Sequence, residues 1–206
     1  MCVEQKKTAV LIPSGEEFIS NKEISDIVYA WILLNGDRDE LGISIDQKPR
    51  GAYKEIGINY RTFYKRLKNL EQAGYLIKDG TYKYYIDNSN CKYKRYIPKE
   101  ILQKLYNTRM DNIIKVYVYL GSLYDTNRKK GVETFFRYNT LVNMLGYYGG
   151  KNGMNRNHWN EAKVRGVVEK LAELGLITYT PRYIKTGSTY QVNLILNNVV
   201  NGKESE

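Results

Sequence analysis

The sequence predicts an α+β fold, mainly α-helical, made of two related small domains that each hold about three helices and a β-hairpin. The main indication is a repeat, because residues 70–77 return 101 positions later as residues 171–178. In both copies an amphipathic helix ends at a glycine, which readily adopts the left-handed conformation that closes a helix, and an apolar run follows. Apolar residues at helical spacing precede both glycines: Phe63, Leu67 and Leu70, then Val164, Val168 and Leu171.

The first copy carries start and stop signals for three helices. Asn21 and Asn59 are suitable N-caps, and Pro49 fits the first turn of a helix. Alternating apolar residues predict a short strand after an acidic turn at 37–40, and the Asp79-Gly80 pair predicts a β-hairpin. The expected elements are helices over 21–35, 49–57 and 60–73, a strand over 43–46, and a hairpin formed by 75–78 and 81–86.

The second copy repeats this order after an additional helix that starts at Pro98. A Gly- and Asn-rich insertion over 146–157 precedes its long helix. The expected elements are helices over 98–106, 112–124, 139–145 and 158–174, a strand over 132–138, and a wider hairpin formed by 177–179 and 189–196. The short aromatic segment 87–96 joins the copies, so we expect the two domains to touch. The predicted organisation is an N-terminal arm with one short strand near 8–12 (1–20), domain 1 (21–90), a linker and connecting helix (91–107), domain 2 (108–196) and a disordered tail (197–206).

The order helix, short strand, helix, helix and hairpin resembles the winged helix family in both halves, over most of residues 20–86 and 108–196. In that family the third helix usually enters the major groove of DNA, and the hairpin wing contacts the backbone or the minor groove. The resemblance therefore implies double-stranded DNA binding. Two such domains in one small basic chain are similar to plasmid and phage replication initiators, or to regulators of low-GC bacteria, which bind repeated DNA sites.

Composition agrees with an anionic partner. The 206 residues carry a net charge of +10, and a hydrophobic fraction of 42% is sufficient for two cores. Cys2 and Cys91 are too few for a disulfide framework or a cysteine zinc site, which favours a reducing cytoplasm. No apolar run approaches the roughly 20 residues of a membrane-spanning helix, and none near the start fits a signal peptide. We expect a soluble, cytoplasmic protein associated with plasmid DNA or the nucleoid.

The first domain carries the stronger DNA-binding signal. Between residues 48 and 68 there are seven basic side chains and one acidic side chain, Glu55. Arginine and asparagine can bond base edges bidentately, whereas lysines mainly hold phosphates. The predicted contacts are Lys48, Arg50, Lys54, Asn59, Tyr60, Arg61, Thr62, Lys65, Arg66, Lys68, Lys78 and Lys83, with residues 59–62 and Lys65 at the reading end. The alternative is that these residues form an ordinary solvated surface.

The second domain gives a weaker signal, because Gly166 and Glu169 stand where the first copy has Lys65 and Lys68. DNA binding and dimerisation are therefore both open for this half. Its predicted DNA contacts are Arg156, Lys163, Arg165, Arg182 and Lys185.

No enzyme chemistry stands out in the sequence. The single histidine, His158, has no histidine partner, and no phosphate-cradling glycine loop is followed by Lys-Ser or Lys-Thr. Tyrosines at 82, 84, 85, 93 and 96 raise the alternative of single-strand stacking, but core and surface roles are commoner. We expect no catalytic residue, metal, cofactor or small-molecule ligand.

The predicted function is sequence-preferring duplex DNA binding in replication initiation or its control, with a homodimer as one arrangement. Two alternatives remain. One is a transcriptional repressor of a mobile element that uses the same surface. The other is a structural adaptor that binds protein, which would need an apolar outer face on the third helix.

Overall fold

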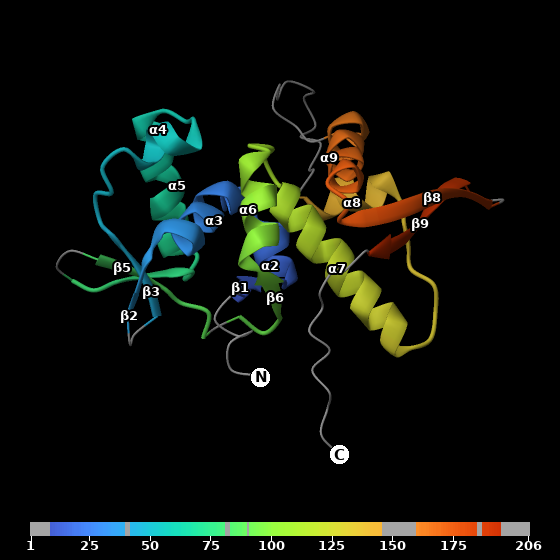
Figure 1. Cartoon of the computed structure of the whole chain (residues 1–206), viewed down its shortest axis with the longest axis horizontal. Helices are drawn as coiled ribbons and strands as arrows, with labels where there is room; N and C mark the ends of the chain where they lie inside the picture. The colour runs from blue at the N-terminus through green and yellow to red at the C-terminus, as the bar shows by residue number, and fades with distance from the viewer. Residues whose placement is uncertain are drawn as a thin grey trace, which may run out of the picture.

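The chain is a mixed α/β protein with antiparallel sheets, seen here as a computed structural model that describes residues 9–39, 42–80, 83–89, 91–145, 160–184 and 187–194. Figure 1 shows an elongated molecule with residues 26–86 at one end and residues 135–194 at the other. Two helices, α6 (Lys99–Asn107) and α7 (Ile113–Lys129), lie between these ends. The disordered tail predicted over 197–206 lies outside the described residues.

The first end contains three helices and a four-stranded sheet in the order β2-β3-β5-β4. In chain order the elements are α3 (Asp26–Asn35), β2 (Asp37–Asp39), β3 (Gly42–Asp46), α4 (Ala52–Ile56), α5 (Tyr60–Gln72), β4 (Leu76–Lys78) and β5 (Lys83–Ile86). The cap predicted at Asn59 is confirmed, since its side chain accepts a hydrogen bond from the Thr62 N–H at 2.8 Å. Gly74, with φ +77°, closes the helix as expected.

Three local predictions for this end were wrong. The first helix begins at Asp26 and not at 21, because Ser25 is its N-cap and Asn21 instead accepts from the Glu23 N–H in a preceding turn. Residues Asp37–Asp39 form the edge strand β2 rather than an acidic turn. In the hairpin, Asp79 N–H donates to the Lys83 carbonyl, so the connection is longer than a two-residue Asp-Gly turn.

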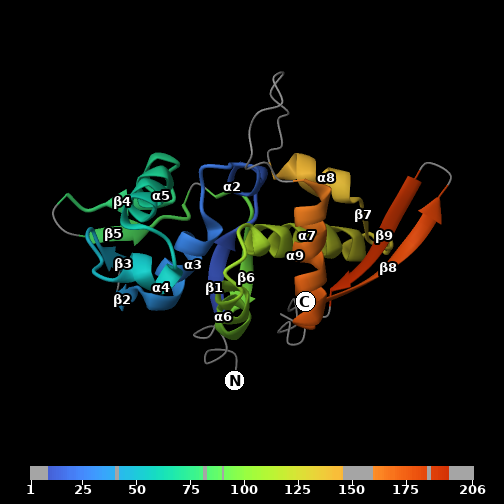
Figure 2. The same ribbon diagram turned by 90° about the horizontal axis from the view of Figure 1, so that it is seen from above.

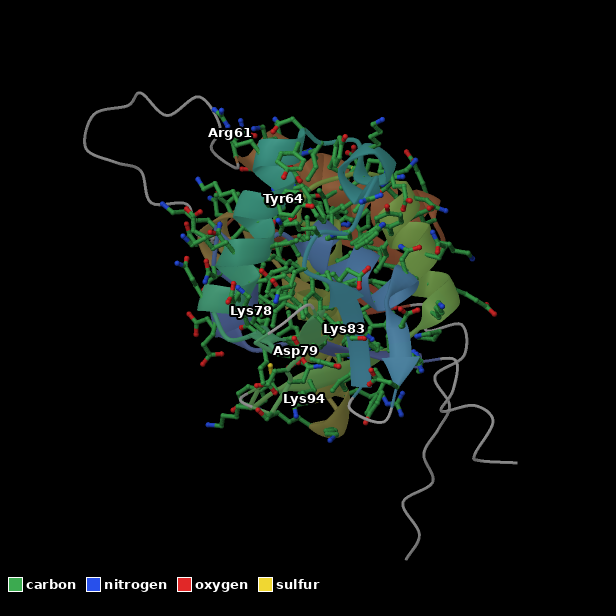
Figure 3. The ribbon with its side chains drawn as sticks, turned by 90° about the vertical axis from the view of Figure 1, so that its left-hand side faces the viewer. Arg61, Tyr64, Lys78, Asp79, Lys83 and Lys94 are labelled. Atoms are coloured by element: carbon green, nitrogen blue, oxygen red, sulfur yellow. The ribbon has the colours of Figure 1, made fainter. Side chains whose placement is uncertain are left out.

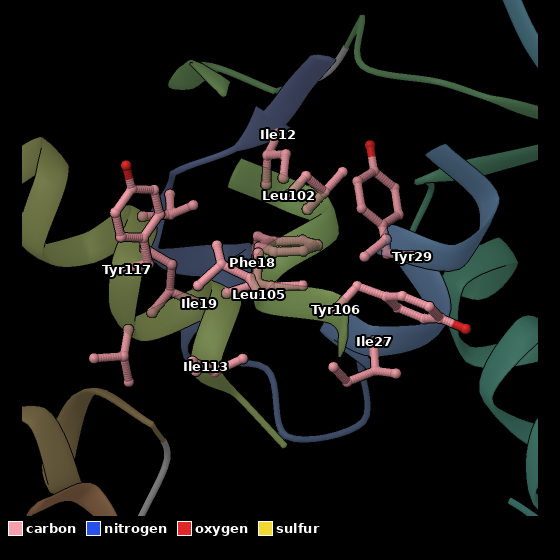
Figure 4. Packing of buried hydrophobic residues seen from close by; sticks show 14 of the residues in the cluster. Ile12, Phe18, Ile19, Ile27, Tyr29, Leu102, Leu105, Tyr106, Ile113 and Tyr117 are labelled. Atoms are coloured by element: carbon pink, nitrogen blue, oxygen red, sulfur yellow. The ribbon is translucent and has the colours of Figure 1, made fainter. Parts of the chain in front are cut away.

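The central part of the molecule incorporates most of the segment predicted as an arm. Strand β1 (Ala9–Pro13) pairs antiparallel with β6 (Lys94–Pro98), and the short helix α2 (Glu16–Ile19) follows β1. Phe18 is 1% exposed and packs among side chains of the central helices, as Figure 4 shows. Val10, Ile12, Phe18 and Ile19 are thus part of the core that they share with the central helices.

The second end has a three-stranded sheet in the order β7-β9-β8. Its elements are β7 (Phe135–Phe136), α8 (Tyr138–Met144), α9 (Glu161–Glu173), β8 (Ile177–Ile184) and β9 (Gly187–Leu194). Figure 2 shows the long β8–β9 hairpin at the far end from the β2–β5 sheet. The predicted strand over 132–138 is reduced to two residues, since helix α8 already begins at Tyr138. The hairpin is longer than predicted, and Arg182 lies within β8 rather than in the connection.

The sequence repeat corresponds to a structural repeat. Helices α5 and α9 each have 13 residues and start 101 positions apart. Asn160, which stands where the first copy has Asn59, accepts a hydrogen bond from the Lys163 N–H at 2.9 Å and caps the helix that starts at Glu161. The predicted start at His158 lies outside the described residues. Gly175 follows α9 with φ +67°, as Gly74 follows α5. The same local signals therefore produce the same helix twice.

Buried polar contacts join the two halves. The Asp26 carboxylate, at the start of α3, accepts hydrogen bonds from the backbone N–H groups of Asn112, Ile114 and Lys115 at the start of α7, at 3.1, 3.1 and 3.4 Å. The Lys115 Nζ donates to the carbonyl oxygens of Asn21 and Ile24, both at 2.8 Å. Burial raises the pKa of Asp26 and lowers that of Lys115 to about 8, and each charge partly offsets the shift of the other.

Candidate nucleic-acid interface

The outer face of α5 is an exposed cationic surface. Its opposite face is fixed in the core by Phe63, Leu67 and Leu70, which are at most 1% exposed. This orientation leaves the side chains of Arg61, Lys65 and Lys68 exposed along the helix, and we call these three residues the α5 ridge. No carboxylate of the described residues forms an ion pair with the ridge. The charge is therefore available to a ligand.

One flank of α5 is engaged inside the molecule instead. The Arg66 guanidinium donates to the Ser25 hydroxyl at 3.2 Å and lies 3.8 Å from the Asp111 carboxylate. Asn69 donates to the backbone oxygen and the carboxylate of Glu23, both at 3.1 Å. Arg66 was predicted as a DNA contact, but these partners direct it toward the joint between the halves. The sequence could not separate Arg66 from Lys65, because the partners of Arg66 are distant in the chain.

The start of α5 was predicted as the reading end. Asn59, Tyr60 and Arg61 are exposed, and Thr62 is half-buried. The Asn59 amide oxygen caps the helix, and bidentate recognition of adenine needs both this oxygen and the amide nitrogen. Base reading by Asn59 therefore requires its oxygen to accept a second hydrogen bond, whereas the polar side-chain groups of Tyr60 and Arg61 have no hydrogen-bond partner among the described residues.

The segment before α5 adds three exposed cations, Lys48, Arg50 and Lys54. The single acid of this stretch, Glu55, accepts a hydrogen bond from the Trp31 indole N–H at 2.8 Å. Its charge is thus partly satisfied by α3.

The β4–β5 hairpin lies on the same side of the molecule as α5. Figure 3 shows Lys78, Asp79 and Lys83 below Arg61 and Tyr64 on this side. Lys78 is exposed and Lys83 is half-buried, while the Asp79 carboxylate accepts a hydrogen bond from the Lys83 N–H. Lys94 of β6 also lies on this side and is exposed. It was not among the predicted contacts, because only the pairing of β1 with β6 places it here.

The second half has a different surface at the corresponding positions. Ala162, Gly166 and Glu169 of α9 stand where α5 has its ridge, so this face of α9 has two small residues and one acid in place of three cations. Arg165 forms an ion pair with Glu161 at 3.2 Å, and Arg182 forms one with Glu133 at 3.3 Å. Two further predicted contacts, Arg156 and Lys185, lie outside the described residues.

An open, polar cleft of about 520 Å³ separates the two third helices. Arg66 of α5 and Lys163 of α9 line it from opposite sides, with Lys22 as a third cation. Its carboxylates are those of Glu23, Asp26 and Asp111. The cleft is therefore balanced in charge, and Lys163 is the one predicted contact of the second half that stays exposed without an ion pair to a described residue.

The tyrosines have mixed environments. Tyr84 and Tyr85 are half-buried, whereas Tyr93 and Tyr96 are 57% and 73% exposed. Tyr82 is not among the described residues. The exposed pair is separated from the α5 ridge in sequence: Tyr96 lies in β6 of the central β1–β6 ribbon, and Tyr93 directly precedes this strand.

Within the described ranges, no group of three or more His, Cys, Asp or Glu side chains is arranged to hold a metal ion. The helices described here also lack the combination of length and apolar character needed to cross a membrane. Comparisons of the chain with protein-family models, with curated proteins and with solved structures gave no match.

Proposed function

We propose that the chain binds double-stranded DNA through the first half, with α5 in the major groove and the β4–β5 hairpin on the backbone. The proposal treats both halves as winged helix domains. It is supported by the order α3, β3, α4, α5, β4 and β5, and by the pairing of β3 with β5 in one antiparallel sheet. A third helix followed by a hairpin in this order is the arrangement that docks on duplex DNA in the winged helix family.

The observation that carries the proposal is the α5 ridge. Three cations lie on the exposed face of one helix, unpaired with any described carboxylate, where lysines can hold phosphates and arginine can bond a base edge. A protein-binding adaptor would instead present an apolar face on this helix, and the outer face of α5 is cationic.

The two halves would have different roles. The face of α9 that corresponds to the α5 ridge has no cation and one acid, Glu169, so we assign the base-reading role to the first half. The second half would hold the first in place, or bring together two copies of the chain on repeated or palindromic sites. Replication initiation or copy control of a plasmid or phage fits this arrangement, and a repressor that uses the same surface is the second candidate.

Fluorescence anisotropy of a labelled duplex at several salt concentrations tests the proposal. Wild-type affinity should fall steeply with salt, because each neutralised phosphate contributes a slope of about −0.9 in a plot of log K against log salt. The variant Arg61→Ala/Lys65→Ala should lose specific binding, and its slope should be shallower by up to about 2. The matched control is Lys99→Ala/Lys104→Ala, which removes two exposed cations from α6 and should bind as wild type does.

Three results would contradict the proposal. Absent or salt-insensitive binding of the wild type would point to the adaptor. An unchanged affinity of Arg61→Ala/Lys65→Ala would reject α5 as the reading helix. An equal loss in the control variant would show that only the total charge matters.

A further inference from the structure

The start of α5 carries an exposed aromatic ring that is held by a chain of other rings. Tyr60 is 58% exposed, and its ring centroid lies 4.5 Å from that of Tyr64 and 5.7 Å from that of Tyr53. Tyr64 contacts Phe63 at 5.3 Å with nearly perpendicular ring planes, and Phe63 is fully buried against Trp31. The outermost ring is therefore connected to the core through edge-to-face and tilted contacts.

A ring held in this way suits recognition, because little side-chain freedom remains to be lost on binding. The hydroxyl of Tyr60 forms no hydrogen bond with any residue that the structure describes, so the exposed part of this side chain, ring and hydroxyl alike, is free to contact a ligand. The next residue, Arg61, is exposed and belongs to the α5 ridge. An exposed aromatic ring and an exposed guanidinium thus occupy successive positions at the helix start.

We infer that Tyr60 reads a thymine through its C5-methyl group, next to a guanine read by Arg61. This inference rests on the proposed function and specifies the DNA that it recognises. N-terminal residues of a recognition helix contact base edges in the major groove, where the thymine methyl is the apolar group and guanine offers two acceptors to arginine. The two bases would lie within about one or two base pairs of each other, as adjacent residues on one helix turn require.

The second half lacks this chemistry. At the position equivalent to Tyr60 it has Glu161, whose carboxylate binds Arg165 within the same helix at 3.2 Å. The thymine preference is therefore assigned to the first half alone.

The test starts from a randomised duplex library, from which the full-length protein selects its preferred sequence. In the enriched duplex each thymine is then replaced, one at a time, by deoxyuridine, which differs only in lacking the methyl group. One thymine near the selected guanine should be sensitive, with wild-type affinity falling about fourfold, the ratio expected for one buried carbon group. Tyr60→Phe should keep this discrimination, and Tyr60→Ala should bind the thymine and uracil duplexes equally.

The outcomes separate the two proposals. If the wild type selects a sequence but no thymine is methyl-sensitive, or if Tyr60→Ala discriminates as the wild type does, the thymine inference is overturned while DNA binding stands. If Tyr60→Phe loses the discrimination, the hydroxyl and not the ring edge is responsible, and the inference is again wrong. If the wild type binds no duplex, the proposed function fails and takes this inference with it.

Discussion

Replacing Asp26 with asparagine should destabilise the whole molecule, because this carboxylate caps a helix of the other half. Its Oδ1 accepts from the N–H groups of Ile27 and Asn112, and its Oδ2 accepts from those of Ile114 and Lys115. Asparagine keeps one acceptor oxygen and turns an NH₂ group toward the second pair of donors. Two buried N–H groups then lose their partner, and Lys115 loses its nearby negative charge.

The magnitude follows from these losses. Each unsatisfied buried donor costs about 1–3 kcal/mol, so the two lost partners together cost about 2–6 kcal/mol. The desolvation that raises the pKa of Asp26 is relieved in the amide, which offsets part of this cost. We therefore expect a net loss of about 2–4 kcal/mol in the free energy of unfolding, or roughly 5–15 °C in Tm for a chain of this length.

Urea unfolding at pH 7, followed by circular dichroism and by tryptophan fluorescence, measures this loss. The matched control is Asp111→Asn in the same cleft. Its carboxylate is 63% exposed and has one ion pair, to Arg66 at 3.8 Å, so its removal should change the stability by less than about 0.5 kcal/mol. If Asp26→Asn is no more destabilising than Asp111→Asn, the carboxylate does not hold the two halves together, and the account given for the joint is wrong.

Three further predictions concern the same architecture. Lys115 has a pKa of about 8 in the folded protein and near 10.5 when unfolded, so between these values the unfolded chain binds more protons and stability rises with pH. The comparison is with the double variant Asp26→Asn/Lys115→Met, which lacks this titrating group. Between roughly pH 8 and 9.5 the unfolding free energy of the wild type should rise, relative to that of the variant, by up to about 1 kcal/mol per pH unit. If the unfolding free energies from urea titrations follow parallel curves against pH in the two proteins, this prediction is wrong. Gly166→Ala should stabilise α9 by about 0.5–1 kcal/mol, since nothing lies within 4 Å of the added Cβ. Gly74→Ala should instead be destabilising, because φ at the end of α5 is +77° and alanine is strained there. Thermal melts that rank the two variants in the opposite order would contradict this. Asn160→Ala should cost about 1 kcal/mol through the lost cap, and an unchanged urea midpoint would exclude that role.

Local signals were sufficient to predict the helices that matter most for the proposed interface. The caps at Asn59 and Asn160 and the stops at Gly74 and Gly175 involve neighbours within a few residues, so they act regardless of the rest of the fold. The apolar stripe of α5 also determined which face of the helix is buried. The exposure of Arg61, Lys65 and Lys68 follows from that stripe alone.

Other features depended on partners far away in the chain. Residues 9–19 read as an arm because their strand partner, β6, lies more than 80 residues later. Arg66 is equivalent to its cationic neighbours in sequence, and only its contacts with Ser25 and Asp111 remove it from the free surface.

The sequence by itself determined where helices start and stop, and that one third helix is cationic and the other is not. The tertiary structure alone decided which cations remain free and how the two halves are joined. Asp26 is an ordinary residue at a helix start until the N-terminus of α7 is brought against it. The physical reason is that capping and periodicity act between neighbouring residues, whereas the buried hydrogen bonds of Asp26 and Lys115 require a folded chain to bring distant backbone groups to them and to exclude water.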